Sequence, residues 1–219
     1  MQNWVFDIRS IKFFALLASF VILTYLVYAK ITQPMDDAII MYVQSLGGNQ
    51  AMDLTMQIFT EIGSVFYMII FCIILFIKKN TRRLGLVLIL SILAGTIASA
   101  YMKDFVGQER PKLEFAGKPF PIGLEQDSSF FGIGSFPSGH ATRTAAFAFV
   151  IGFALSGRFP RGCYLLWIYP LLVSISRVFI LQHFPMDVIG GTLLGILVAD
   201  IVSKKLKLHL IFDNQKSSS

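Results

Sequence analysis

The sequence predicts an all-α integral membrane protein, a bundle of six transmembrane helices with a long extracytoplasmic loop between the third and the fourth. Composition is the first reason, because 55% of the 219 residues are hydrophobic and only 15% are charged, against about 25% charged in an ordinary soluble domain. A soluble protein of this size needs more polar surface than such a composition supplies. The second reason is that the apolar residues form continuous runs, without the alternation typical of membrane-barrel strands.

The composition also excludes two other classes for the chain as a whole. A mean hydropathy of +0.67 is incompatible with intrinsic disorder and with a nucleic-acid-binding tail. The net charge of +6 is better interpreted by position, as a signal of membrane topology. We expect membrane lipids around this protein, no nucleic acid partner and no obligate protein partner.

Six apolar stretches account for the predicted helices. They cover residues 13–29, 62–77, 84–102, 141–155, 164–180 and 188–202. Several fall slightly short of the ~20 residues that cross a bilayer, but polar residues at their ends can extend each helix to the interface. The stretches form one domain over residues 1–219, which ends in a polar tail at 213–219.

The first stretch has a second interpretation. Arg9 and Lys12 precede it, and Val27-Tyr28-Ala29 weakly resembles a signal-peptide cleavage site. The apolar region of a cleaved signal peptide is usually shorter than this run. We therefore interpret the stretch as the first span.

Basic residues indicate which side of the membrane each connection faces. If all six stretches span, four segments share one side: 1–12, 78–83, 156–163 and 203–219. These segments hold twelve of the 19 Lys and Arg residues, and such residues concentrate in cytoplasmic segments. We therefore expect a multi-pass cell-membrane protein with both termini in the cytoplasm. The outer segments are then 30–61, 103–140 and 181–187, of which 103–140 is long enough to suggest a functional loop.

No pattern in the sequence indicates a metal, a disulfide framework or a bound cofactor. The two cysteines, Cys72 and Cys163, have neither the number nor the spacing of disulfide or zinc ligands. A glycine-rich phosphate loop and a Gly-x-Ser-x-Gly nucleophile motif are absent from the sequence as well.

Ionisable residues from four segments meet at the predicted outer edge of the membrane. They are Lys103, Arg110, His140, Arg177, His183 and Asp187. Ionisable groups near membrane depth are candidates for function by default. Taken singly, each cation could be a residue that extends its charge to the interface, so the argument depends on the group as a whole.

Two of these segments look like helix starts. In Pro137-Ser138-Gly139-His140, Ser138 is a plausible N-cap, and Gly139 lets a backbone N–H approach a ligand closely. Pro185 fits the first turn of the last helix, and the four-residue spacing of His183 and Asp187 permits a contact between their side chains. Helix N-termini bind anions, and a carboxylate bonded to one imidazole nitrogen leaves the other free to attack. The combination of helix starts and cations predicts a site for a highly charged anion such as phosphate.

Three motifs in this region resemble those of the type 2 phosphatidic acid phosphatase superfamily, a group of membrane lipid phosphatases. The motifs are Lys103, six residues and Arg110-Pro111; then Pro137-Ser138-Gly139-His140; then Ser176-Arg177, five residues, His183, three residues and Asp187. They span residues 103–187, and the six-helix layout extends the likeness over nearly the whole chain. Two departures occur: Leu181 stands where many members carry glycine, and Lys112-Leu113 where many carry a second Arg-Pro.

The resemblance implies a two-step phosphoryl transfer that needs no metal or other cofactor. His183 would attack phosphorus and form a phosphohistidine, Asp187 would orient it, and His140 would protonate the leaving oxygen and then activate water. The remaining motif residues would bind the phosphate oxygens: Lys103, Arg110, Ser138, Gly139 and Arg177. Arg143 follows His140 by three residues and has two interpretations, a contact with a second phosphate or a loop ion pair.

An outward-facing site suits a lipid pyrophosphate such as undecaprenyl or another polyprenyl pyrophosphate. Phosphatidylglycerophosphate and phosphatidic acid are alternative substrates. A lipid transporter or flippase with an anion site would explain the spans and the cations, but not a His–Asp pair facing a second histidine. Vanadate haloperoxidases share the motifs but are soluble, and an inactive scaffold is disfavoured because all motif side chains are intact.

Overall fold

The computed structural model describes residues 10–113 and 134–208, and within them the chain is helical, with no strand. The α-helices are α1 Ile11–Tyr28, α2 Gln33–Ser45, α3 Gln50–Ile62, α4 Val65–Ile77, α5 Arg82–Val106, α6 Gly139–Ser156, α7 Ile168–Phe179 and α8 Pro185–Lys205. Two 3₁₀ helices, η1 Lys79–Thr81 and η3 Gly162–Trp167, precede α5 and α7. The all-α prediction is thus confirmed for the described residues.

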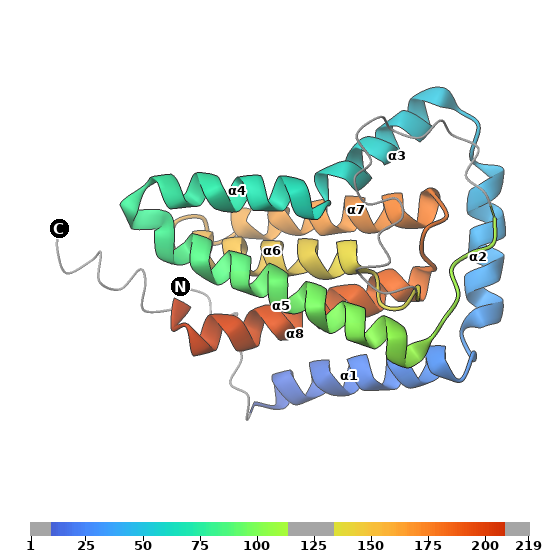
Figure 1. Ribbon diagram of the computed structural model, residues 1–219, viewed down its shortest axis with the longest axis horizontal. Helices are drawn as coiled ribbons and strands as arrows, with labels where there is room; N and C mark the ends of the chain where they lie inside the picture. The colour runs from blue at the N-terminus through green and yellow to red at the C-terminus, as the bar shows by residue number, and fades with distance from the viewer. Residues whose placement is uncertain (1–9, 114–133, 209–219) are drawn as a thin grey trace.

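The long helices lie side by side, and one short helix closes an end of the bundle. Helices α4 to α8 run lengthwise, α1 flanks them beside α8, and α2 crosses the end where α1 stops (Figure 1). Helix α6 packs against α5, α7 and α8, so 15 of its 18 residues are buried. The middle of the bundle is therefore built around α6.

Length and hydropathy identify four helical segments that can cross a membrane: Ile11–Tyr28, Lys79–Val106, Gly162–Phe179 and Pro185–Lys205. Helices α3 and α4 form a fifth candidate, bent by 49° between Ile62 and Val65. Helix α6 is not among these segments; it is buried between α5, α7 and α8 and carries His140 and Arg143 near its start. The span predicted at 62–77 begins later, at Val65, and the segment predicted as a connection, 30–61, contains α2 and α3.

Local sequence explains where the helices at the site begin and end. Helix α5 ends at Gly107, whose φ of +64° is easily adopted by glycine and whose N–H donates to the carbonyl of Lys103. Helix α8 begins with Pro185, and the carboxylate of Asp187 in its first turn accepts the N–H of Phe184. Residues 114–133 of the long loop lie outside the described residues.

Glycines bring the first turns of α6 and α8 into backbone contact. A Cβ on Gly191 would lie 2.4 Å from the carbonyl oxygen of Ser138, and one on Gly195 would lie 2.3 Å from that of Thr142. This Gly-x-x-x-Gly spacing lets membrane helices approach closely. As a result, the N–H of Ser138 donates to the carbonyl of Asp187 at 2.9 Å, and the second and third motifs become neighbours.

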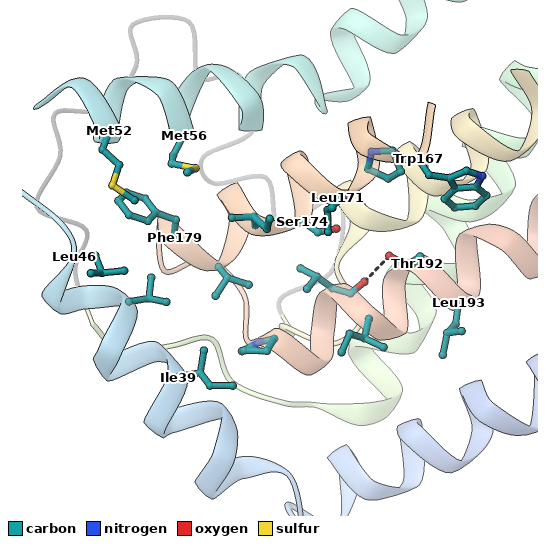
Figure 2. A pocket seen from close by; sticks show the side chains of 17 residues that line it. Ile39, Leu46, Met52, Met56, Trp167, Leu171, Ser174, Phe179, Thr192 and Leu193 are labelled. Carbon is teal, nitrogen blue, oxygen red and sulfur yellow. Dashed lines mark hydrogen bonds between the residues drawn. The ribbon is translucent and has the colours of Figure 1, made fainter. Parts of the chain in front are cut away.

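An apolar groove of about 720 Å³ runs between α2, α3, α7 and α8. Figure 2 shows Ile39 and Leu46 of α2, Met52 and Met56 of α3, and Phe179 of α7 around it. Its lining also includes Val178, Pro185, Val188, Ile189, Leu193 and, further along, Trp167 and Leu171. Among its lining residues only Ser174, Thr192 and the indole of Trp167 carry polar side-chain atoms.

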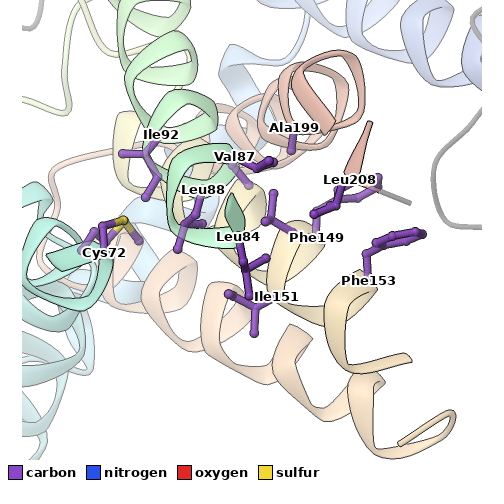
Figure 3. Close-up of a cluster of buried hydrophobic side chains, with 13 residues drawn as sticks. Cys72, Leu84, Val87, Leu88, Ile92, Phe149, Ile151, Phe153, Ala199 and Leu208 are labelled. Carbon is purple, nitrogen blue, oxygen red and sulfur yellow. The ribbon is translucent and has the colours of Figure 1, made fainter. Parts of the chain in front are cut away.

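The main hydrophobic core lies toward the other end of the bundle, near the start of α5. Leu84, Leu88 and Ile92 of α5 pack there with Phe149 of α6 and Cys72 of α4 (Figure 3). Burial of such side chains stabilises each by about 1.5–3 kcal/mol. The core thereby fixes α5 and α6, whose opposite ends carry site residues.

Candidate active site

The structure brings the three motifs together at the end of the bundle that α2 crosses. Lys103 lies in the last turn of α5, Arg177 in the last turn of α7, and His140 in the first turn of α6. His183 occupies the turn between α7 and α8, and Asp187 the first turn of α8. All five are buried, and Asp187 is completely inaccessible.

His183 and Asp187 form the centre of the site. Nδ1 of His183 lies 3.4 Å from Oδ2 of Asp187. The same oxygen accepts the backbone N–H of Phe184 at 2.8 Å and the hydroxyl of Ser135. A carboxylate on Nδ1 fixes the ring so that Nε2 carries the lone pair. The pair can therefore present a nucleophile.

Burial, together with positive surroundings, favours the neutral form of this histidine. Burial, followed by the positive charge of Arg177 and then of Lys103, lowers the pKa of His183 well below its usual range. Arg110 acts in the same direction, and its Nη1 donates to the side-chain oxygen of Gln182 at 2.9 Å, next to the histidine. A neutral imidazole is the form that can attack an electrophile.

His140 faces the same pocket with a defined tautomer. Nη2 of Arg143 lies 3.3 Å from Nδ1 of His140. Because a guanidinium only donates hydrogen bonds, this contact is a hydrogen bond when His140 is neutral, with Nδ1 as the acceptor and the ring proton on Nε2. Arg143 is buried in α6 and lies against His140, so it belongs to the pocket.

Four cations make the pocket strongly positive. Lys103 interacts electrostatically with each of the others, and we call this group the cation cluster: Lys103, Arg110, Arg143 and Arg177. Within the described part of the chain, no three His, Cys, Asp or Glu side chains come together as a metal site. The charge and the helix starts suit a multiply charged anion.

Ser138 and Gly139 lie at the N-terminus of α6, as predicted from the sequence. Ser138 is fully buried, and its Oγ has no hydrogen-bond partner among the residues that the structure describes. A Cβ on Gly139 would lie 3.3 Å from Nη1 of Arg143, so a side chain there would press on this guanidinium. The hydroxyl and the glycine N–H are both placed to contact a bound oxyanion.

Sequence reasoning missed Ser135, which touches both members of the His–Asp pair. Its hydroxyl donates to Asp187 and lies 3.4 Å from Nδ1 of His183. The end of the long loop sets this position, because the N–H of Ser135 donates to the carbonyl of Gln108 and Gly134 lies against the backbone of Lys103. Nothing in the motif spacing signals this contact.

Leu181 takes the left-handed conformation, with φ of +58°. Such a backbone costs a non-glycine residue about 1–2 kcal/mol. Its side chain is buried with Ile40 of α2 and Phe184, and burying a leucine contributes about 1.5–3 kcal/mol. The strain of a non-glycine residue here is therefore offset by packing, and Leu181 attaches the turn that carries His183 to α2.

Comparison with known proteins identifies the family of this chain. Residues 80–208 match the family model described as PAP2 superfamily. An undecaprenyl-diphosphatase of Sulfolobus acidocaldarius is 28% identical over 173 residues, 70% of this chain and 79% of the relative. Phosphatidylglycerophosphatase B of Bacillus subtilis is 32% identical over 125 residues, 54% of this chain and 56% of the relative.

Two solved structures share the fold. The Bacillus subtilis PAP2-type phosphatidylglycerolphosphate phosphatase superposes with a TM-score of 0.73 at 25% identity, covering 90% of this chain and 96% of that one. Aquifex aeolicus LpxE gives 0.59 at 27% identity, covering 76% and 93%. The site lies within the matched residues, and the chain belongs to the PAP2 superfamily of membrane phosphatases.

Proposed function

We propose that this protein hydrolyses a lipid phosphomonoester or a polyprenyl pyrophosphate through a phosphohistidine, on the extracytoplasmic side of the membrane. The observation that carries the proposal is the buried His183–Asp187 pair, 3.4 Å apart, whose histidine interacts electrostatically with three residues of the cation cluster and with His140. An anion site alone would not need a neutral, carboxylate-held histidine. A transporter therefore explains the site less completely than a phosphatase does.

The reaction follows from the placement of the groups. Nε2 of His183 attacks phosphorus as the bond to the leaving oxygen breaks, and protonated His140 gives that oxygen its proton. The arriving phosphate favours the protonated form of His140 because its negative charge offsets the nearby cations. Water then attacks the phosphohistidine, His140 takes its proton, the P–N bond breaks and phosphate leaves. The cation cluster, Ser138 and the N–H of Gly139 stabilise the charge on phosphorus oxygens.

The apolar groove supports a substrate with a long hydrocarbon tail. Val178 and Phe179, which line it, follow Arg177 directly, and Pro185 lies between His183 and Asp187. A chain bound in the groove would therefore bring its phosphate to the pocket. A polyprenyl pyrophosphate is our first candidate, with Arg143 placed to bind a second phosphate; phosphatidylglycerophosphate and phosphatidic acid are the alternatives.

Phosphate release in detergent tests the function. We expect the purified protein to release phosphate from at least one lipid of a panel of undecaprenyl pyrophosphate, phosphatidylglycerophosphate and phosphatidic acid. EDTA should leave the rate unchanged because cations and amides take the place of a metal, and vanadate should inhibit as an analogue of five-coordinate phosphorus. Loss of activity in EDTA with recovery in magnesium would contradict the metal-free mechanism, and no release from any lipid would contradict the function.

The proposed topology has six spans, with α3–α4 as one span and α6 as another. Helix α5 has 25 residues, or about 38 Å at ~1.5 Å per residue, which is enough to cross the bilayer. The basic segment 78–83 lies at its start and the pocket at its end. By the positive-inside rule, the pocket then faces outward and both termini face the cytoplasm.

Thiol labelling of intact cells tests this topology. In a variant whose two buried cysteines are replaced by alanine, we expect Lys112→Cys, at an exposed position after α5, to react with a membrane-impermeant reagent. Arg82→Cys, at the other end of α5, should react only after the cells are opened. The reverse pattern would show that the site faces the cytoplasm.

A further inference from the structure

A carboxylate outside the three motifs contacts the catalytic turn. Asp36 lies in the first turn of α2 and is completely buried. Its Oδ1 accepts the backbone N–H of Met186 at 3.1 Å. That N–H belongs to the first turn of α8, where backbone donors have no partner within the helix. Met186 lies directly before Asp187 and three residues after His183.

Helix α2 also packs on the other side of the same turn. Ile40, one helical turn after Asp36, is buried against Leu181 and Phe184. The turn between α7 and α8 therefore has two attachments to α2, one apolar and one a hydrogen bond. Its third attachment is to α7, where the N–H groups of Gln182 and His183 both donate to the carbonyl of Arg177.

The hydrogen bond from the N–H of Met186 to Asp36 is made by a group whose burial is itself unfavourable. Burial raises the pKa of Asp36 to about 6, so at neutral pH an ionised group is kept in an apolar surrounding, which is unfavourable. Its Oδ2 has no hydrogen-bond partner within residues 10–113 and 134–208. An asparagine would accept the same N–H without burying a charge.

We infer that Asp36 is a positioning residue for the proposed reaction, and that its bond to the N–H of Met186 fixes the turn that carries His183 and Asp187. This inference rests on the proposed function for its kinetic consequence. The carboxylate does not touch the reacting atoms; it acts through the backbone of α8. Small errors in the placement of a nucleophile are costly, since a displacement of about 1 Å can lower the rate by about 10²-fold.

The kinetic test compares Asp36→Ala with Asp36→Asn and with Asp37→Ala, an exposed neighbour whose carboxylate accepts a bond from Gln33. We expect Asp36→Ala to lower kcat by about 10- to 100-fold with KM changed by less than about threefold, because the cation cluster is untouched. Asp36→Asn should keep most of the activity, because its amide oxygen accepts the same N–H, and Asp37→Ala should behave as wild type. Full activity in Asp36→Ala, or equal losses in Asp36→Ala and Asp36→Asn, would overturn the inference.

Hydrogen exchange gives a readout that needs no substrate. Peptides covering residues 181–190 should exchange faster in Asp36→Ala than in wild type, with no change in Asp36→Asn or Asp37→Ala. If Asp36→Ala does not fold, Asp36→Leu fills the same space without an acceptor and takes its place in both measurements. Unchanged exchange in Asp36→Ala would overturn the positioning role, even if the wild type is an active phosphatase. Faster exchange in Asp36→Ala, together with no phosphatase activity in the wild type, would refute only the proposed function.

Discussion

His183→Ala is expected to lower kcat by several orders of magnitude with every lipid substrate. The variant lacks the only imidazole that lies 3.4 Å from Asp187 among the described residues, so no phosphohistidine can form at this position. Hydrolysis by water directly would lack the two-step route that covalent catalysis provides. Phosphate release under single-turnover conditions, together with capture of acid-labile phosphoenzyme, measures the loss.

His209→Ala is the matched control for this substitution, because it removes the third histidine of the chain, which no motif includes. The control should keep wild-type kinetics. Since His183 is almost completely buried, the melting temperature of His183→Ala must be measured to separate lost chemistry from lost folding. A folded His183→Ala variant that retains a tenth of wild-type activity would rule out the phosphohistidine mechanism.

His140→Ala is expected to show an effect that depends on the leaving group. With an alkyl lipid phosphate, which leaves as a poor alkoxide, loss of the proton donor should lower kcat by about 10²- to 10⁴-fold. With a phenolic leaving group, which needs no proton, formation of the phosphohistidine should be much less affected. The second step still needs a base to activate water, so phosphoenzyme should accumulate in this variant.

The pH profile provides the second readout for His140→Ala. Wild-type kcat/KM should be bell-shaped, with its maximum between about pH 5.5 and 8. Because the pKa of His183 is lowered, this histidine stays neutral as the pH falls through ~6.5, the ordinary imidazole value; its acid limb lies below that pH. His140→Ala should remove the alkaline limb with the phenolic substrate. A wild-type rate that rises steadily to about pH 10 would contradict a histidine acid.

The candidate site residues could be identified from the sequence because each motif is a short local pattern and the helices that carry them are strongly apolar. Helix N-terminal chemistry around Ser138 and Pro185 marks the starts of α6 and α8. The four-residue spacing of His183 and Asp187 permitted their contact, although the turn is not helical: α8 begins only at Pro185. Backbone bonds to Arg177 and side-chain bonds to Asp187 hold the histidine in place instead.

Contacts between segments far apart in the chain could not be predicted from the sequence in this way. Ser135 reaches Asp187 only because the loop returns to the end of α5. Asp36 reaches Met186 because α2 crosses the end of the bundle. The sequence of this segment has mixed polarity, which does not predict the direction in which the helix runs. The spacing of Gly191 and Gly195 was the one available signal for the α6–α8 contact, since small residues four apart favour close helix packing.

The close contact of α6 and α8 has a thermodynamic consequence for anion binding. Each helix N-terminus is equivalent to about half a positive charge, and the glycine contact sets two of them side by side next to the cation cluster. If the pocket binds phosphate as proposed, inorganic phosphate should favour the native state as a linked ligand. A ligand at 100 times its Kd raises the free energy of unfolding by about 2.7 kcal/mol. The same positive charge that would bind a substrate phosphate is thus expected to raise the melting temperature of the protein when inorganic phosphate is added.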